Sequence, residues 1–240
     1  MLPKTRREIF TSGLSIKELL QLKDAGFEPL GLTIGASVFQ IGFQNLKAIE
    51  HIELPALTQA MYQARNLSLA RMIARAGELG ADGIVGLTLS SAIKPWGDGT
   101  GEFTAVGTAV RHSIPGSYLT PKGRPFTTAL NGDDFWILIS SGSRPLSYVI
   151  GNCVYQISFQ PPKSPTLQAI QNVEMLTHSR AVGDGRELAL ARMRAEGEYY
   201  GGDGIIGASV TESSYGWNTH MVEYFASGSS ISALQNPEAR

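Results

Sequence analysis

A 20-residue segment that occurs twice constrains the fold of this chain more than any other feature. Residues 67–86 read LSLARMIARAGELGADGIVG, and residues 188–207 read LALARMRAEGEYYGGDGIIG. Aligned without a gap, the copies are identical at 11 of the 20 positions: Leu67, Leu69, Ala70, Arg71, Met72, Ala74, Gly80, Asp82, Gly83, Ile84 and Gly86 recur 121 residues later. Each copy is typical of the end of a helix, a glycine turn and the start of a buried strand.

The repetition continues on both sides of this segment and predicts two tandem modules. Residues 34–44 recur at 150–160, and residues 102–110 at 223–231. We expect a first module at 10–111, a proline-containing and glycine-containing linker at 112–125, and a second module at 126–232. The predicted fold class is α+β, with a short helix in front of each β-α-β-β module.

The first module supplies the clearest local signals. Ser15 and Glu18 have the spacing of a capping box, which predicts a short helix behind them. Strands are expected at 30–43, 84–89 and 102–110, and a long helix from Pro55 to about residue 79, where Gly80 ends it. In the second module we expect the glycines of residues 183–185 to split the corresponding helix.

Charge and composition exclude several functional classes. The formal net charge of the 240 residues is −1, with a pI near 6.4 and no basic stripe, so nucleic acid and anionic membrane surfaces are poor partners. No apolar run is long enough to insert into a membrane and no signal sequence is visible, so we expect a cytoplasmic protein. With Cys153 as the only cysteine, neither an intramolecular disulfide nor a cysteine-based zinc site can form within one chain.

Charged residues that recur in both modules are the candidate site residues. They are Arg71, Asp82, Glu102, Arg192, Asp203 and Glu223. One interpretation is structural: an arginine and a carboxylate tie a helix to a sheet, or one subunit to the next. A polar ligand pocket is the second interpretation. General acid–base catalysis is the third, but no nucleophile accompanies the carboxylates, so we expect no enzymatic activity.

The four histidines do not form a recognisable metal motif. His51, His112, His178 and His220 show neither an i, i+4 pair nor a Cys/His spacing. His51 and His178 precede or begin helices of different modules, at non-equivalent positions. The sequence therefore predicts no preformed metal site within one chain, although ligands from several chains can meet at an oligomer axis.

The strings ARMIARAGELGADGIVGL and EFTAVGTAV, with their second copies ARMRAEGEYYGGDGIIGA and EYFASGSSI, resemble the YbjQ-like family of small bacterial proteins labelled as heavy-metal-binding. The resemblance covers about residues 27–110 and 143–231, and the second copy departs from the pattern at Gly202 and at residues 229–230. It implies a dodecin-like module that assembles into pentameric rings through strands added across subunits. The tandem form with leading helices is similar to actinobacterial proteins.

These observations together predict a closed homo-oligomer, with a pentamer that holds ten modules in one ring or in two stacked rings as the first expectation. A three-stranded sheet covered by one helix leaves edges and a face open, and ring closure removes them. We expect a non-enzymatic scaffold or binding protein. The alternative is a protein that binds a heavy metal or a small ligand between subunits; the divalent heavy metal is implied by the family resemblance alone.

Overall fold

The structure is a computed structural model that describes residues 9–40, 51–94, 99–157, 175–214 and 221–233. The first half of the chain contains α1 (Ile16–Asp24), β1 (Phe27–Gln40), β2 (Ile52–Glu53), α2 (Pro55–Glu78), β3 (Gly83–Ile93) and β4 (Thr100–His112). The second half contains β5 (Phe126–Thr127), α3 (Gly132–Ser140), β6 (Ser143–Gln156), α5 (Leu176–Tyr199), β7 (Gly204–Ser214) and β8 (Met221–Ala233). This is the predicted α+β fold class.

The helix boundaries of the first half follow from the signals in the sequence. The Ser15 hydroxyl accepts a hydrogen bond from the Glu18 N–H, and the Glu18 carboxylate accepts one from the Ser15 N–H, so the predicted capping box is confirmed. Pro55 is the first residue of α2, and Gly80 follows its end with a φ of 71°. Few residues other than glycine adopt that left-handed conformation cheaply.

The predicted break at residues 183–185 is wrong, because α5 runs without interruption through them. A glycine in a helix costs about 1 kcal/mol relative to alanine, which a packed helix can tolerate. A Cβ built on Gly185 would lie 2.5 Å from the buried ring of Tyr224. This glycine therefore allows α5 to approach β8 closely, rather than ending the helix.

The strands extend beyond the predicted ranges. β3 continues from the expected end at residue 89 to Ile93, and β4 spans Thr100–His112 instead of residues 102–110. The outer part of β3 is exposed and lacks apolar alternation, so its pairing with β4 left no signal in the sequence. β1 begins at Phe27, earlier than expected, and the predicted residues 41–43 lie outside the described ranges.

Each of the two sheets takes one short strand from the other half of the chain. The strand orders are β1-β4-β3-β5 and β2-β6-β8-β7. β5 precedes α3 in sequence, yet it pairs in parallel with β3, placing Phe126 opposite Gly83. β2 precedes α2, yet it pairs with β6, placing Ile52 opposite Gln156. The exchange is reciprocal and was not predicted, because two-residue strands have no periodicity to detect.

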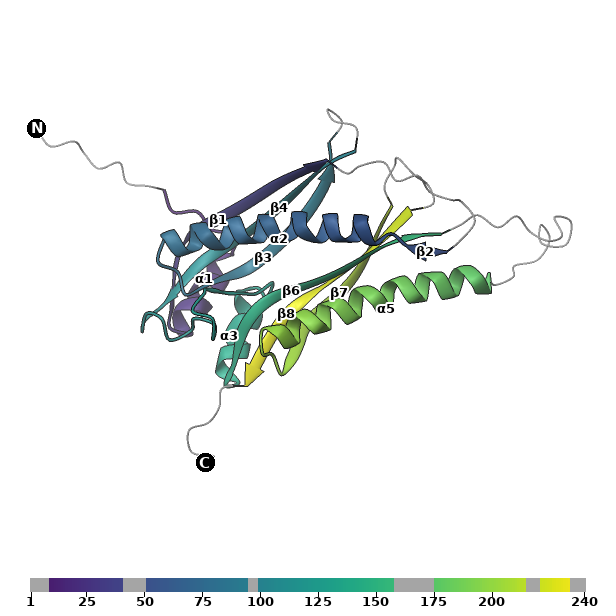
Figure 1. Ribbon diagram of the computed structural model, residues 1–240. Helices are drawn as coiled ribbons and strands as arrows, with labels where there is room; N and C mark the ends of the chain where they lie inside the picture. The colour runs from purple at the N-terminus through teal and green to yellow at the C-terminus, as the bar shows by residue number, and fades with distance from the viewer. Residues whose placement is uncertain (1–8, 41–50, 95–98, 158–174, 215–220, 234–240) are drawn as a thin grey trace, which may run out of the picture.

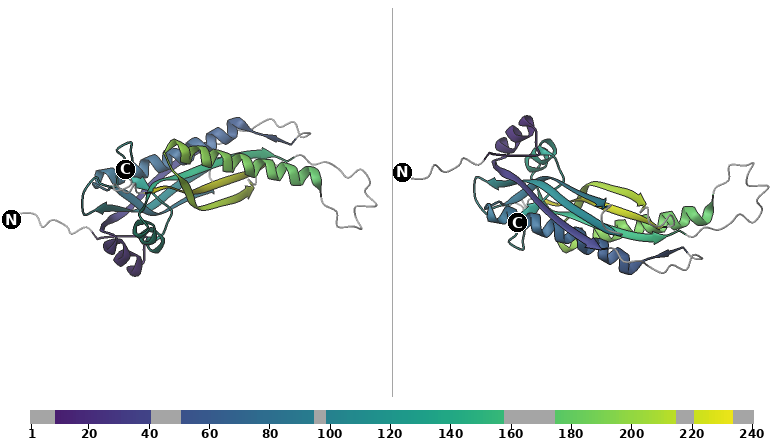
Figure 2. Two further views of the ribbon diagram at one scale, coloured as in Figure 1. Left: turned by 90° about the horizontal axis from the view of Figure 1, so that it is seen from below. Right: turned by 90° about the horizontal axis from the view of Figure 1, so that it is seen from above.

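The hydrophobic core is shared between the halves. Of four buried clusters in the described part of the chain, three contain residues from both halves. Figure 1 shows α2 and α5 running along the sheets, and Figure 2 shows α1 and α3 together on the opposite face. Neither half can bury its apolar surface without the other. No helix within the described ranges is both long and apolar enough to cross a membrane.

Candidate functional site

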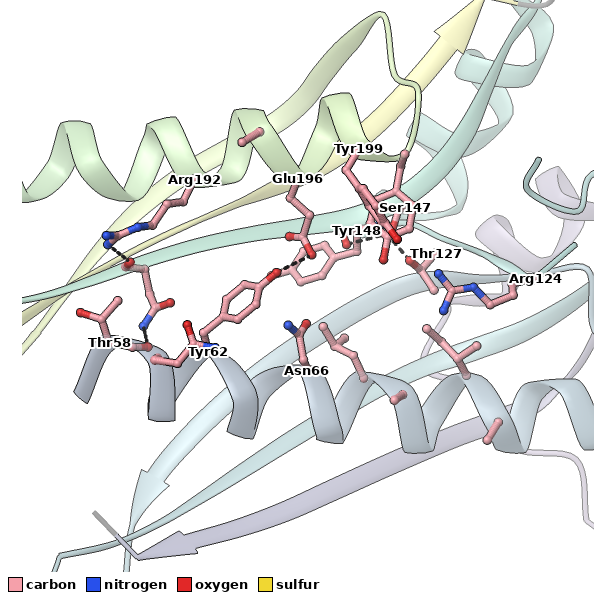
Figure 3. A pocket seen from close by; sticks show the side chains of 18 of the residues that line it. Thr58, Tyr62, Asn66, Arg124, Thr127, Ser147, Tyr148, Arg192, Glu196 and Tyr199 are labelled. Atoms are coloured by element: carbon pink, nitrogen blue, oxygen red, sulfur yellow. Dashed lines mark hydrogen bonds between the residues drawn. The ribbon is translucent and has the colours of Figure 1, made fainter. Parts of the chain in front are cut away.

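A pocket of about 990 Å³ lies between α2 and α5, with β6 at its back (Figure 3). The α2 wall is polar at Thr58 and Asn66 and apolar at Leu69 and Ile73. Glu196 and Tyr199 come from α5, and Tyr148 comes from β6. An apolar cavity of this size that contains a few converging polar groups is the usual form of a small-molecule site.

Glu196 is the polar centre of the pocket. Its carboxylate accepts hydrogen bonds from the Ile150 N–H at 2.5 Å and from the Tyr62 hydroxyl at 3.1 Å. Burial raises the pKa of Glu196 above its ordinary value, although both hydrogen bonds act to lower it. Burial also raises the pKa values of Tyr62 and Tyr148, so both phenols are neutral at neutral pH.

Arginines lie at the two ends of this pocket. At one end, the Arg192 guanidinium donates to the Asn152 carbonyl at 2.8 Å and forms an ion pair with Glu53 of β2, also at 2.8 Å. At the other end, Figure 3 shows the Arg124 guanidinium turned into the space between the helices. Among the described residues, no carboxylate lies within ion-pair distance of Arg124.

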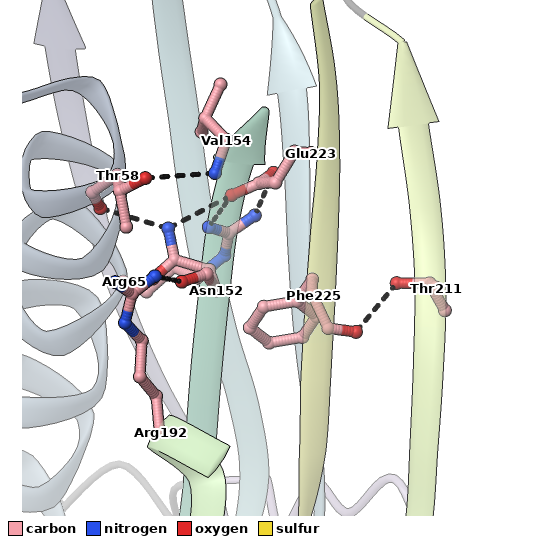
Figure 4. A network of polar contacts seen from close by, with 8 residues as sticks. All are labelled: Thr58, Arg65, Asn152, Val154, Arg192, Thr211, Glu223 and Phe225. Atoms are coloured by element: carbon pink, nitrogen blue, oxygen red, sulfur yellow. Dashed lines mark hydrogen bonds and ion pairs between the residues drawn. The ribbon is translucent and has the colours of Figure 1, made fainter. Parts of the chain in front are cut away.

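A buried ion pair joins the two halves beside the pocket. Arg65 of α2 donates two hydrogen bonds to the Glu223 carboxylate of β8, at 2.5 and 2.8 Å (Figure 4). The side chains are only 4% and 1% exposed. Asn152 of β6 donates to the same carboxylate at 3.3 Å and to the Thr58 carbonyl at 3.0 Å. Such a bidentate geometry fixes the relative position of helix and sheet.

Arg71 and Glu102, the first-half counterparts of Arg192 and Glu223, have more exposed surroundings. Arg71 donates to the Ala36 carbonyl at 2.6 Å, as Arg192 does to Asn152. Glu102 forms a partly exposed ion pair with Lys94. The two arginines therefore have equivalent contacts within their own halves, whereas the two glutamates do not. In the described structure only Arg192 and Glu223 also contact the other half.

Asp82 has a structural role in this chain. It is buried, and its carboxylate accepts hydrogen bonds from the backbone N–H groups of His112 at 2.8 Å and Gly116 at 2.7 Å. These contacts hold the start of the linker against β3. Its counterpart Asp203 is exposed at the start of β7, and its backbone N–H donates to the Ile231 carbonyl.

Two of the histidines meet, contrary to expectation. The rings of His51 and His178 are 5.0 Å apart between centroids, because β2 brings residue 51 beside the start of α5. Burial, and then the neighbouring His178, lower the pKa of His51. Within the described ranges, no group of three or more His, Cys, Asp or Glu side chains is placed to hold a metal ion. His220 lies outside those ranges.

Comparison with known proteins identifies the family. The family model described as "Putative heavy-metal-binding" (YbjQ) matches residues 30–113. Over 223 residues, the chain is 41% identical to the Encapsulin nanocompartment protein Rv1762c of Mycobacterium tuberculosis, covering 92% of this chain and 85% of the relative. This chain belongs to the YbjQ-like family.

Shorter YbjQ-like relatives match only part of the chain. A UPF0145 protein of Vibrio campbellii is 43% identical over 69 residues, which are 28% of this chain and 62% of the relative. A UPF0145 protein of Pseudothermotoga lettingae is 35% identical over 89 residues, which are 35% of this chain and 82% of the relative. The match to the mycobacterial protein, by contrast, extends over both halves.

Several residues of the site were missed in the sequence. Arg65 recurs as Arg186 at the same offset of 121, just before the aligned segment, so a wider search for recurring charges would have found it. Tyr62 and Glu196 have no such signal, because residues 183 and 75 at the equivalent positions are glycine and arginine. Tyr62 and Glu196 are candidate binding residues because they line the pocket and differ from the residues at the equivalent positions of the repeat.

Proposed function

We propose that this protein is a non-enzymatic, ring-forming scaffold or binding protein of the cytoplasm. Its chain is divided into tandem modules at 10–111 and 126–232, joined by the linker at 112–125. Chains associate head to tail, and our preferred assembly is a pentamer that holds ten modules in one ring. The name of the mycobacterial relative, an encapsulin nanocompartment protein, supports a role in assembly.

The observation that carries the proposal is a contact between the two halves of the chain, which we call the completed joint. The sequence repeat supplies both sides of a second contact of the same kind, which we call the open joint. In the completed joint, Phe126 of β5 is 0% exposed against β3, and Arg65 reaches the buried Glu223. The repeat places Phe10 at the position of Phe126, yet Phe10 is 49% exposed. It also places Arg186 and Glu102 at the positions of Arg65 and Glu223.

The two sides of the open joint fit one contact between two chains. Within one chain Arg186 pairs with Glu212, and Glu102 pairs with Lys94, and neither ion pair is buried. In our proposal, α5 of one chain lies on β1 and β4 of the next, so that Arg186 reaches Glu102. In return, Phe10 and Thr11 of the next chain pair with β7 of the chain that supplies α5. β7 is the end strand of its sheet, so this edge is open to a partner. One repeated contact of this kind is head to tail, and it closes into a ring when its rotation divides a full turn.

The edges of the sheets provide the physical reason for closure. β1 and β7 each end a sheet, and unpaired strand edges favour association. Val38 on β1 is 53% exposed, whereas its counterpart Val154 on β6 is fully covered. A neighbouring chain would cover the surface around Val38, just as the first half of the same chain covers the surface around Val154.

Native mass spectrometry of Arg186→Glu tests the arrangement. We expect the unmodified chain to give the mass of a closed ring, five chains in the preferred form. Arg186→Glu should dissociate it, and Arg186→Glu combined with Glu102→Arg should restore it, because the charges are exchanged across the contact. Arg194→Glu, an exposed change on the same helix, is the control. A monomer at micromolar concentration, or a ring unaffected by Arg186→Glu, would contradict the proposal.

Heavy-metal binding is a second candidate function, favoured by the family description. The adjacent rings of His51 and His178 are the place where we would expect an ion to bind, because neutral imidazole is a common metal ligand and the pKa of His51 is lowered. Elemental analysis of protein purified without chelator, beside a His51→Ala/His178→Ala variant, tests this. Equal metal content in the two proteins, or none in either, would exclude this pair.

A further inference from the structure

The pocket between α2 and α5 has chemistry that the joint between modules does not need. The repeat provides the comparison, because each lining residue has an equivalent at the open joint. Positions that carry the same residue, such as Leu69 with Leu190, or Arg192 with Arg71, belong to the common fold. Positions that differ identify the side chains that the pocket has and the equivalent open joint lacks.

Several of the positions that differ carry aromatic or acidic side chains in the pocket. Tyr148 corresponds to Leu32, Glu196 to Arg75 and Tyr62 to Gly183, while Tyr199 and Tyr200 correspond to Glu78 and Leu79. The tyrosines and the carboxyl group are thus concentrated at one of two equivalent joints. The fold of the other module forms without them, so packing alone does not account for their presence.

The arrangement of these groups indicates the chemistry of a ligand. Tyr148, Leu69 and Ile73 provide an apolar and aromatic surface large enough for a ring system. Glu196 of α5 and Tyr62 of α2 form a hydrogen-bonded polar pair that joins the two helices across the pocket. The Arg124 guanidinium points into the pocket from its end, and the Lys122 ammonium lies 3.2 Å from the centre of the Tyr199 ring. That end is positively charged.

We propose that this pocket binds a small anionic aromatic molecule. Its ring system lies against Tyr148, Leu69 and Ile73, its acidic group contacts Arg124, and a polar group on its ring contacts Glu196 and Tyr62. A carboxylate or sulfonate suits the planar fork of arginine. All these residues belong to one chain, so the site does not depend on ring assembly, and a monomeric chain would also bind.

Fluorescence titration of the full chain with anilinonaphthalene sulfonate tests the proposal, since this probe combines an aromatic body with one sulfonate. We expect saturable binding of one probe per chain. Arg124→Gln should weaken it at least about tenfold, the usual effect of losing one charge-assisted contact. The matched control is Arg111→Gln, an exposed arginine paired with Glu28 outside the pocket, which should leave the affinity unchanged.

Two further measurements separate recognition from nonspecific adsorption. The uncharged analogue phenylnaphthylamine should bind more weakly than the sulfonate, and Arg124→Gln should not change its affinity. Tyr148→Leu and Glu196→Arg introduce residues that the other module carries at the equivalent positions, and each should weaken sulfonate binding while circular dichroism remains unchanged. Binding that is not saturable, or that Arg124→Gln and Arg111→Gln change equally, would overturn the proposal.

Discussion

Arg65 and Glu223 show how a single contact can hold two halves of a chain together. A buried ion pair gains little over apolar residues of similar size, because both charges lose their hydration. Removing one partner is different, since it leaves a charge in an apolar setting. Here the Arg65 guanidinium also lies 4.4 Å from the ring centre of Phe225 and 5.2 Å from that of Phe103, so its environment is largely aromatic.

We therefore expect Glu223→Leu to lower the free energy of unfolding by about 3–5 kcal/mol. The double variant Arg65→Met/Glu223→Leu should recover most of this loss, because no buried charge is left unpaired. Urea unfolding of both variants, followed by circular dichroism, measures the difference. A single change that costs less than about 1 kcal/mol, the range of exposed pairs, would show that the pair is not buried in solution.

Glu196 should make stability depend on pH. Burial raises its pKa in the folded chain above the ordinary value of 4.5, so the folded state binds this proton more tightly than the unfolded state. The stabilising contribution is complete below that ordinary value and is lost as the pH rises through the folded pKa. Glu196→Gln removes the titration and keeps a hydrogen-bond acceptor.

The free energy of unfolding of Glu196→Gln, relative to the unmodified chain, should therefore increase over the pH range above the ordinary glutamate pKa of 4.5. Urea titrations across this range measure it. Glu198→Gln, a change on the exposed side of the same helix, controls for the loss of a carboxyl group from α5. A constant difference across the range would place the Glu196 carboxyl in water.

At the scale of elements, α5 provides a matched pair of glycines. A Cβ on Gly183 would meet nothing within 4 Å, whereas one on Gly185 would meet the Tyr224 ring at 2.5 Å. Gly183→Ala should raise the free energy of unfolding by about 0.5–1 kcal/mol through helix propensity. Gly185→Ala should lower it by about 1–3 kcal/mol through overpacking, and thermal unfolding of both variants measures each effect. Equal effects would mean that α5 does not pack closely against β8.

The same helix illustrates what the sequence could and could not predict. Helix boundaries at Ser15, Pro55 and Gly80 depend on local chemistry, and they were predicted correctly. The glycines in α5 were misinterpreted because their reason is tertiary: a ring from β8 occupies the space. β2 and β5 were missed for a related reason, since a two-residue strand is defined by its partner.

The candidate site could also be predicted from the sequence only in part. Recurrence identified Glu223 and Arg192, which the structure places at the contact between the halves, but it also selected Asp82, which holds the linker. Arg65, the partner of Glu223, was overlooked. The pocket around Glu196 could not be predicted, because it depends on how two helices from separate halves lie beside one another.

At the scale of the whole molecule, the proposed ring couples folding to association. Any molecule that binds the folded state but not the unfolded state stabilises the fold by mass action, and a neighbouring chain would act in this way. We expect the Tm of the unmodified protein to rise with protein concentration. Phe10→Ala should abolish this dependence, because it removes the side chain that would cover β7 of the neighbour.

Scanning calorimetry over a hundredfold concentration range provides this measurement. Phe126→Ala is the informative contrast. Phe126 is the second-half counterpart of Phe10, and its ring is fully buried within one chain. It should cost about 3–5 kcal/mol at every concentration. A concentration-independent Tm in the unmodified protein would count against assembly through this surface.

The tyrosines and the carboxyl group occur at only one of the two kinds of joint, so the proposed ring would contain two different contacts in alternation. In a ring of identical modules every step around the axis would be chemically the same. Here the steps would alternate between a joint within a chain, which carries the pocket beside Glu196, and a joint between chains, where arginine occupies that position. Neighbouring pockets would therefore be two modules apart, which leaves each ligand isolated from the next and makes successive binding events independent.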